Sequence, residues 1–554
     1  MLMQRLKNVQ HVLLLFRDPM VFASKLGAKI SVFWDEFWLS SDAREMVAYN
    51  KKTWAGYAKS DSDKIILVEM HGIFTNVIAC LSFANVLARK KGAVICSFGR
   101  EKWPLRRVVH AIYRSFNARR HFDIMALSPE QKVRVRGIIA DVRPGLKTAE
   151  DVFNLKVDQV HIGMDIYESY LKETSRPTVE IDAALDGMLE FAVSVLVFWS
   201  DFFRQHQVVA AIVSHDVYID SNILCRIAYR DGVPAYLPNN FNVIRSCRPH
   251  TSTARFLSYR YWFDRLSKDE QALGLAKAKE QLTRRFKGEL EGDMLHAPVS
   301  AFDPKNEGGR VLRQSDKPKV LICTHCFYDN PYSYGGMFFL DFREWLMFLK
   351  EIADQTDYDW YLKTHPAPLP GTHEIIREIL GENSSITVIP SKSTPRQMIR
   401  EGLQYVLTVY GSVGHEYPAL GVQVVNAGYN PHVAYDFTWT PRNREEYRQW
   451  LLDLPSLKKN IDINELYEFY YMHYYYSSFD DCVYPSARQL AMSVGVKGLG
   501  SQKLFRYVLD HGDPAHHKKM ISRFEAFIDS DMDYLFLKGP VSGKPGAVIA
   551  SRVT

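Results

Sequence analysis

Residues 64–98 have the sequence KIILVEMHGIFTNVIACLSFANVLARKKGAVICSF. The run KIILVE, at 64–69, is almost continuously apolar, which is typical of a strand that is covered on both faces. The turn His71-Gly72 follows, then a helical pattern over 75–91, and then a second apolar run, AVICSF, at 93–98. Strand, helix and strand in this order predict a βαβ unit of a parallel sheet.

The same alternation continues along the chain. Further strands are predicted at 208–214, 233–237, 319–324, 359–363, 386–389, 405–409 and 422–427, with helical patterns between most of them. We therefore expect the α/β fold class, with two doubly wound Rossmann-like domains that face a cleft and helical additions at both ends. The expected segments are an N-terminal amphipathic helical segment (1–60), a first α/β domain (61–300), a linker (301–318), a second α/β domain (319–440) and a helical region with a tail (441–554).

The composition excludes several classes of protein. Of the 554 residues, 47% are hydrophobic and 24% are charged, so disorder, collagen and coiled coil are excluded as the main state. The net charge of +6 is too small to indicate a nucleic-acid partner, but it is compatible with an anionic substrate or membrane surface. The longest apolar run, at 191–199, is too short for a membrane span and predicts a buried helix.

Seven cysteines are present, and only Cys323 and Cys326 lie close together in the sequence. No second pair has the spacing of a zinc site, so a metal site that combines these two with His325 is not expected. We interpret the cysteines as reduced, buried thiols of a cytoplasmic protein.

Residues 1–60 place Leu, Phe and Trp beside Arg and Lys in a helical pattern. One interpretation is a helix that lies on a membrane surface, which would give the protein a peripheral contact with the cytoplasmic face of the inner membrane. The other is a helix packed on the next domain. We favour packing, because aromatic stripes at helical spacing usually belong to a core.

Residues 408–435, TVYGSVGHEYPALGVQVVNAGYNPHVAY, contain the most informative pattern. A strand runs into the small-residue loop 411–414, and a helix is expected to begin there. The N–H groups at the start of a helix suit a phosphate, so Gly411, Ser412 and Gly414 are candidate nucleotide-binding residues. Glu416 follows in the first helical turn, where it either contacts the ligand or caps the helix.

A second pattern is WYLKTHP at 360–366. Pro366 favours an extended conformation of His365, which places the imidazole at the carboxyl end of a predicted strand. Lys363 adds a positive charge at the same strand end.

These two segments resemble the donor-nucleotide half of GT-B glycosyltransferases, whose motif has a Glu, a small-residue helix, Gly, a short gap and a Val-Val strand. The resemblance implies that Glu416 holds ribose hydroxyls. The His-Pro step is similar to that of bacterial sialyl- and Kdo-transferases, which use CMP-activated acidic sugars, and of CDP-glycerol polymerases. It implies that His365 contacts the leaving phosphate. The resemblance covers mainly 319–440, with the general plan of 61–260.

This sequence departs from those families at two places. The acidic-acidic-glycine motif of the sialyltransferases is absent, and the nearest counterpart is the stretch from Glu69 to Gly72, EMHG. Gly411-Ser412 stands where the polymerases have paired serines. The donor therefore stays open between a CMP-sugar and a CDP-polyol.

Further candidate residues follow other predicted strands. Glu69 and His71 follow the first strand, and His215 and Asp216 follow the strand at 208–214. A residue of each pair can act as general base on an acceptor hydroxyl. The alternative is that the pair only stabilises a turn or caps a helix. Thr324, His325 and Asp329 follow the strand at 319–324 and are expected to face the cleft. The aromatic runs 258–263 and 467–476 either stack on sugar rings or pack domains, and we favour packing.

We expect a metal-independent glycosyltransferase, without a cofactor, that moves a sugar from a nucleotide-activated donor to a glycan or lipid-linked acceptor of a bacterial surface polysaccharide. The catalytic candidates are His365, Glu69, His71 and Asp216. Alternatives are a CDP-polyol phosphotransferase, a sugar epimerase of the same fold and a non-catalytic glycan-binding or assembly protein. The Walker loop and the Rossmann dinucleotide fingerprint are missing, which argues against an NTPase and a dehydrogenase.

Overall fold

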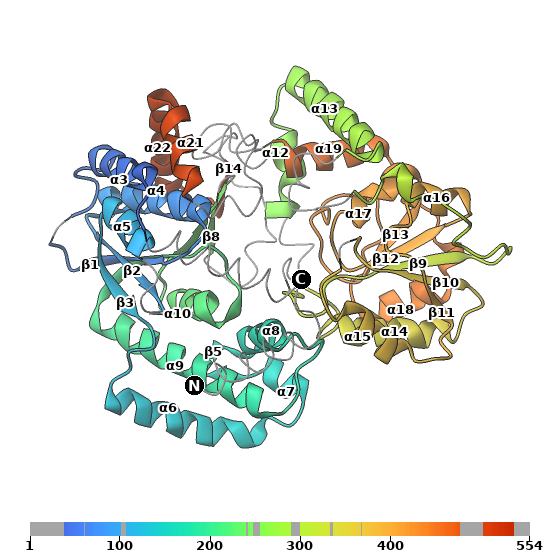
Figure 1. Cartoon of the computed structure of the whole chain (residues 1–554), viewed down its shortest axis with the longest axis horizontal. Coiled ribbons are helices and arrows are strands. Elements are labelled where there is room, and N and C mark those ends of the chain that lie inside the picture. The colour runs from blue at the N-terminus through green and yellow to red at the C-terminus, as the bar shows by residue number, and fades with distance from the viewer. Residues whose placement is uncertain are drawn as a thin grey trace. The chain divides into compact units, whose positions relative to one another are not determined.

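The computed structural model describes residues 38–59, 61–100, 107–239, 242–246, 255–289, 300–332, 336–366, 368–476 and 502–536. They form two compact units (Figure 1). The first unit holds the described residues of Met1–Ser169, Glu180–Cys247 and Phe479–Leu537, and the second holds those of Tyr170–Val179 and Arg248–Ser478.

The first unit is built on a seven-stranded sheet with the order β14-β8-β7-β6-β1-β2-β3. Its strands are β1 (Lys64–Glu69), β2 (Val94–Gly99), β3 (Ala118–Asp123), β6 (Gln207–Ile212), β7 (Ala235–Pro238), β8 (Asn242–Ser246) and β14 (Tyr534–Phe536). The five strands from β3 to β7 are parallel, while β8 and β14 pair antiparallel at one edge. The interior of β1 is buried throughout, as predicted for a strand covered on both faces.

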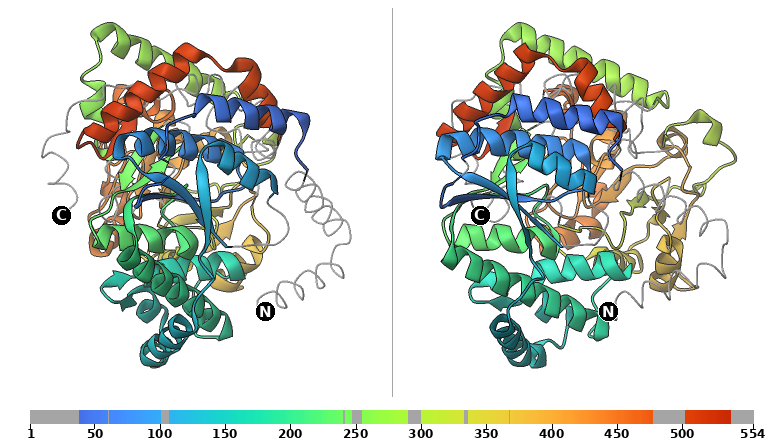
Figure 2. Two further views of the ribbon diagram at one scale, coloured as in Figure 1. Left: turned by 90° about the vertical axis from the view of Figure 1, so that its left-hand side faces the viewer. Right: turned by 60° about the vertical axis from the view of Figure 1, so that its left-hand side comes forward.

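Helices cover both faces of this sheet (Figure 2). One layer consists of α3 (Ser41–Thr53), α4 (Phe74–Lys91), α5 (Arg107–Ser115), α21 (Lys503–His511) and α22 (Pro514–Asp529). The opposite layer consists of α6 (Pro129–Val142), α9 (Ala183–Gln205) and α10 (Ile223–Arg230). Smaller elements are η1 (Arg143–Gly145), α7 (Ala149–Phe153), β4 (Lys156–Val157), β5 (Val160–His161), α8 (Gly163–Thr174) and η2 (Tyr218–Asn222).

The apolar sequence of α9 reflects its place in the core. Among the described residues it is the one helix long and apolar enough to cross a membrane, and 61% of its most apolar window is buried inside the protein. The prediction that residues 191–199 form a buried helix is therefore confirmed. The amphipathic helical segment predicted for residues 1–60 lies mostly outside the described residues. The described α3 packs on α5 and α21.

The second unit has an entirely parallel five-stranded sheet with the order β11-β10-β9-β12-β13. Its strands are β9 (Lys319–Cys323), β10 (Asp359–Lys363), β11 (Ile386–Val388), β12 (Tyr405–Thr408) and β13 (Gln423–Asn426). Its helices are α12 (Tyr259–Phe263), α13 (Lys268–Phe286), η4 (Pro304–Asn306), α14 (Phe342–Ala353), α15 (Thr372–Leu380), α16 (Pro395–Arg400), α17 (Val413–Glu416), η5 (Pro418–Leu420), α18 (Arg444–Leu452), η6 (Leu454–Ser456) and α19 (Ile463–Tyr474). The predicted α/β class with parallel sheets is confirmed in each unit.

Two apolar clusters cover the two faces of this sheet. Ile322 and Trp360 belong to one cluster with residues of α14, α15 and α18. Leu321 and Tyr361, which are their neighbours in the sequence, belong to the other cluster with Met398 of α16. Because successive side chains of a strand point to opposite faces, burial of both sets explains the continuous apolar runs in the sequence.

The aromatic runs pack against each other, as the sequence analysis favoured. They form α12 and α19, and α19 also packs on α13. Tyr259 hydroxyl lies 2.9 Å from His473 Nδ1. Gly274 of α13 leaves room for the ring of Tyr471, because a Cβ at position 274 would lie 2.7 Å from it. The described cysteines have no disulfide partner, and all but the partly exposed Cys326 are buried.

Candidate functional site

A cavity of about 170 Å³ opens at the carboxyl ends of β9, β10 and β12 in the second unit. Seven residues predicted from the sequence line it: Thr324, His325, Lys363, His365, Gly411, Ser412 and Glu416. The structure thus brings the loop after β12 and the His-Pro step after β10 into one pocket.

The strand order explains why the pocket forms here. From β9 the chain proceeds outward through β10 to β11, and then returns to the other side of β9 to form β12 and β13. The connections that leave β9 and β12 therefore run in opposite directions, and a crevice remains between them. Ligands of doubly wound sheets bind at this switch point.

Glu416 forms a buried ion pair on the wall of the cavity. Nε of Arg285, at the end of α13, donates to Glu416 Oε1, and both residues are less than 8% exposed. Arg285 was not predicted as a site residue, and the sequence analysis placed it in the first α/β domain (61–300). The structure therefore adds a fixed positive charge to the pocket and a structural partner for Glu416.

Lys363, the last residue of β10, is also buried at the cavity. Burial lowers the pKa of its ammonium group, while the nearby Cys323 and Glu416 oppose this shift. An anion in the cavity would stabilise the charged form of Lys363 and relieve part of the desolvation cost.

Two threonine hydroxyls add to this arrangement. Thr324 and Thr364 directly follow β9 and β10, both line the cavity, and both are more than 90% buried. Neither Oγ1 atom has a hydrogen-bond partner among the described residues. Since an unpaired buried hydroxyl costs free energy, a polar group bound in the cavity would relieve that cost by pairing with these two hydroxyls.

His325 is held as a neutral ring. It stacks on Phe342, with 5.1 Å between ring centroids, and on Tyr410, with 4.4 Å. The Tyr410 N–H donates to its Nε2 over 3.4 Å. Burial, with a smaller effect of His365, lowers the pKa of His325 to about 3. His325 therefore serves as an uncharged wall of the pocket rather than as an acid.

His365 is exposed and lines the cavity next to Pro366. It follows the buried Lys363 and Thr364, so the backbone carries the chain out of the core at this point. This position at the edge of the pocket agrees with the expected one at the end of a strand.

The loop after β12 differs from the expected helix. α17 has only four residues, and a 3-10 turn, η5, follows it at once. Pro418 explains the short helix, because it has no N–H to donate to a carbonyl one turn earlier. The loop itself contains Gly411 with φ of 107°, a conformation that favours glycine, and a Cβ there would lie 3.4 Å from His325.

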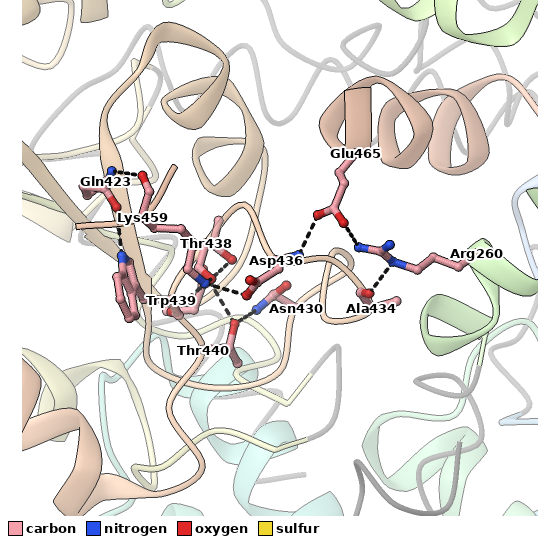
Figure 3. Close-up of polar contacts among 11 residues, drawn as sticks. Arg260, Gln423, Asn430, Ala434, Asp436, Thr438, Trp439, Thr440, Lys459 and Glu465 are labelled. Atoms are coloured by element: carbon pink, nitrogen blue, oxygen red, sulfur yellow. Dashed lines mark hydrogen bonds and ion pairs between the residues drawn. The ribbon is translucent and has the colours of Figure 1, made fainter. Parts of the chain in front are cut away.

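Gly414 does not line the cavity. A Cβ at this position would lie 2.2 Å from Cε1 of His432, so the glycine makes room for that ring. The segment that carries His432 is tied down by a polar network (Figure 3). In it, Arg260 Nε donates to the carbonyl of Ala434 over 2.8 Å, and the Asp436 N–H donates to Glu465 over 3.1 Å.

Lys459 completes this network from the other side, with its Nζ 2.6 Å from Asp436 Oδ1 and 2.9 Å from the carbonyl of Thr438. Trp439 Nε1 donates to Gln423 of β13 over 2.8 Å. The network fixes the segment after β13, in which His432 packs against Gly414. Asp329 is exposed and does not line the cavity.

The first unit places its candidates at its own switch point, between β1 and β6. Glu69 ends β1, and its Oε2 accepts from both the N–H and the hydroxyl of Ser214, each over 2.8 Å. Ser221 donates to Oε1 over 2.6 Å. Both oxygens of Glu69 are therefore occupied, so the carboxylate orients its neighbours.

His215 is linked to Glu69 through Ser214. Its Nδ1 lies 2.6 Å from Ser214 Oγ. Because the Ser214 hydroxyl gives its proton to Glu69, the hydrogen between Ser214 and His215 must come from Nδ1. The other nitrogen, Nε2, then carries the lone pair in the neutral ring.

His71 is held in the opposite tautomer. Its Nδ1 accepts from the N–H of Ile73 over 3.0 Å, so its Nε2 carries the hydrogen in the neutral ring. The rings of His71 and His215 are 6.4 Å apart and nearly perpendicular. Asp216 is partly buried and adjoins this pair in the sequence.

The residues of these sites that were missed include Ser214, Ser221, Thr364 and Arg285. Ser214 and Thr364 each directly precede a predicted histidine at a strand end, so the sequence contained a signal for both. Arg285 lies 131 residues before Glu416, and no local pattern connects the two.

No protein-family model and no curated protein match this chain. Similar solved structures include KpsC of Thermosulfurimonas dismutans, a beta Kdo 2,4 transferase, at 16% identity over 48% of this chain and 79% of that chain, with a TM-score of 0.29. UDP-GlcNAc 2-epimerase of Neisseria meningitidis is 11% identical over 74% of this chain and 94% of that chain, with a TM-score of 0.21. MnaA of S. aureus, solved with UDP, is 11% identical over 74% and 91%, with a TM-score of 0.20. At TM-scores below 0.5, these likenesses do not decide what this chain does.

Proposed function

We propose that this protein is a nucleotide-sugar-dependent glycosyltransferase whose donor is a CMP-linked acidic sugar and whose acceptor is a glycan or lipid-linked glycan of a bacterial surface polysaccharide. The observation that carries the proposal is the cavity of the second unit. It combines Lys363, Arg285 and two unpaired threonine hydroxyls at the switch point of a parallel sheet. These groups suit the phosphate and sugar oxygens of a nucleotide donor.

The donor phosphate would lie on the Gly411-Ser412 loop, near Lys363. His365, at the edge of the cavity, would donate a hydrogen bond or a proton to the phosphate oxygen as the bond from the anomeric carbon to that oxygen breaks. The electron pair of the broken bond remains on the phosphate. Glu416, held by Arg285, would meet the ribose hydroxyls.

His215 would act as the general base on the acceptor. An acceptor hydroxyl bound beside His215 would give its proton to Nε2 as its oxygen forms the new bond to the sugar carbon. Ser214 and Glu69 hold the ring and stabilise the resulting imidazolium. His71, with a hydrogen on Nε2, would donate a hydrogen bond to the same acceptor. The protein would act at the cytoplasmic face of the inner membrane.

A thermal-shift panel of CMP, CDP, UDP and GDP tests the donor site, because a ligand that binds the folded state raises the melting temperature. We expect CMP to give the largest shift in the wild type. The shift should be lost in Lys363→Met and kept in Lys392→Met, which changes an exposed lysine of the same unit.

The reaction is tested by following nucleotide release from a CMP-sugar. Release that requires a glycan acceptor supports a transferase. Epimerisation of a sugar without an acceptor indicates an epimerase, and transfer of a polyol phosphate indicates the CDP-polyol enzyme. A folded protein that binds none of the nucleotides would indicate the non-catalytic glycan-binding role.

A further inference from the structure

A second hollow lies in the first unit, between α5 and the edge strand β3. Its volume is about 490 Å³. Four arginines line it: Arg107, Arg114, Arg119 and Arg120. His110 and His121 also line it, and none of its lining residues in the described part of the chain carries a carboxylate.

The charges of this hollow are presented to solvent. All four arginine side chains are exposed. Of the ion pairs among the described residues, none involves Arg114, Arg119 or Arg120. The like charges of Arg114, Arg119 and Arg120 repel each other, and the cost falls when an anion lies between them.

Other side chains of the lining add hydrogen-bonding groups. Ser97 of β2 lies 3.0 Å from Nδ1 of His121, and the rings of His110 and His121 are 5.2 Å apart. Tyr113 of α5 lines the hollow, while its hydroxyl accepts from the His71 N–H over 2.9 Å and donates to the carbonyl of Glu69. The hollow therefore adjoins the switch point of the first unit.

We propose that the hollow between α5 and β3 binds a phosphate-bearing anion through Arg107, Arg114, Arg119 and Arg120. A guanidinium group presents paired donors that match phosphate oxygens, and two elements here present such groups from two sides. The site lies outside the donor cavity. The proposal does not depend on whether a nucleotide binds in the second unit. The phosphate belongs either to a soluble ligand or to a lipid headgroup.

An alternative explanation is that the arginines only protect an edge strand from pairing with another chain, since charge is a common means of doing so. The two explanations differ in what neutral variants do. Edge protection predicts self-association without any change in anion binding, whereas a binding site predicts loss of the anion from a monodisperse protein.

The test is calorimetric titration of the full chain with inorganic pyrophosphate in low salt. The variants are Arg114→Gln/Arg119→Gln, the matched surface control Arg136→Gln on α6, and Lys363→Met, which removes the donor-cavity charge. We expect the double variant to weaken one class of pyrophosphate site at least tenfold and Lys363→Met to affect only the other class. Circular dichroism and size-exclusion chromatography establish that each variant is folded and monodisperse.

Co-sedimentation with phosphatidylglycerol vesicles, against phosphatidylcholine vesicles, identifies the source of the phosphate. Salt-sensitive binding that the double variant loses supports the site with a lipid headgroup as its ligand. Pyrophosphate binding that the double variant loses, without vesicle binding, supports the site with a soluble ligand. If the double variant binds both probes as Arg136→Gln does, the proposal is wrong.

Discussion

Nε of Arg285 donates to Oε1 of Glu416 in the buried wall of the second unit's cavity, across 131 residues of sequence. This contact changes what is expected of Glu416. A carboxylate that only met a ligand could be removed without harm to the fold, but this one neutralises a buried guanidinium.

Glu416→Ala is therefore expected to destabilise the protein by about 3–5 kcal/mol, because it leaves Arg285 buried without its partner. The free energy of unfolding, measured by urea denaturation, checks this. Arg285→Met/Glu416→Gln should be closer to the wild type, because no unpaired charge remains. A stability of Glu416→Ala equal to that of the wild type would show that the ion pair contributes nothing.

The double variant also isolates the ligand role of Glu416. If the carboxylate holds ribose hydroxyls, Arg285→Met/Glu416→Gln should bind CMP more weakly by about 1–3 kcal/mol even though it is folded. Calorimetry on the folded double variant gives this number. An unchanged affinity for CMP would show that Glu416 stabilises the fold and does not contact the nucleotide.

Lys363→Met is expected to raise the melting temperature and to lower the affinity for CMP. The pKa of Lys363 is lowered in the folded state, so folding disfavours its charged form, and methionine removes that cost at similar size. The gain should be largest at neutral pH and should shrink as pH rises toward 10.5, where the unfolded lysine also loses its proton. Thermal unfolding at pH 7 and at pH 10 measures both parts, and a lower melting temperature at pH 7 would contradict the expectation.

His365→Ala is expected to stay folded, since the side chain is exposed, and to lose turnover by about 100- to 1,000-fold. An interaction that strengthens as charge develops on the leaving phosphate lowers the barrier more than it tightens acceptor binding. His365→Asn should keep part of the activity, because an amide can still donate a hydrogen bond. Normal turnover per folded molecule in His365→Ala would remove this residue from the mechanism.

His215→Asn is expected to lose the acidic limb of the pH profile of kcat/KM, where protonation of a general base lowers activity. Ser214→Ala should keep the base but shift the apparent pKa of that limb, because the ring loses the link to Glu69. If Ser214→Ala has normal stability and an unchanged pH profile, the link through Ser214 to Glu69 does not affect His215.

The second unit is expected to lose stability in mild acid. Burial lowers the pKa values of His325 and His415 to about 3, against an ordinary value of about 6.5. The unfolded chain therefore binds protons that the folded chain does not, and the stability present above pH 6.5 falls as pH drops toward 3. The slope is about 1.4 kcal/mol per pH unit for each histidine. In His415→Gln, the slope of the unfolding free energy against pH should fall by the contribution of one proton. An unchanged slope would show that His415 does not contribute to the loss of stability in acid.

The sequence alone determined the parallel strands and the histidine at the end of β10. A strand buried on both faces needs a continuous apolar run, so KIILVE and its counterparts could be recognised locally. Residues that directly follow a parallel strand lie at its carboxyl end whatever the rest of the fold does. For this reason Lys363, His365 and Ser412 could be placed at a common sheet edge before their neighbours were known.

Only the tertiary structure decided which groups act together. The strand order, which sets β12 beside β9, follows from packing of whole helices and not from any local pattern. Arg285 reaches Glu416 from a helix that is remote in the sequence, and Ser214 links Glu69 to His215 across two adjacent strands. Periodicity reports the burial of one segment at a time, whereas an ion pair or a hydrogen-bond relay depends on distances between segments, which the fold sets.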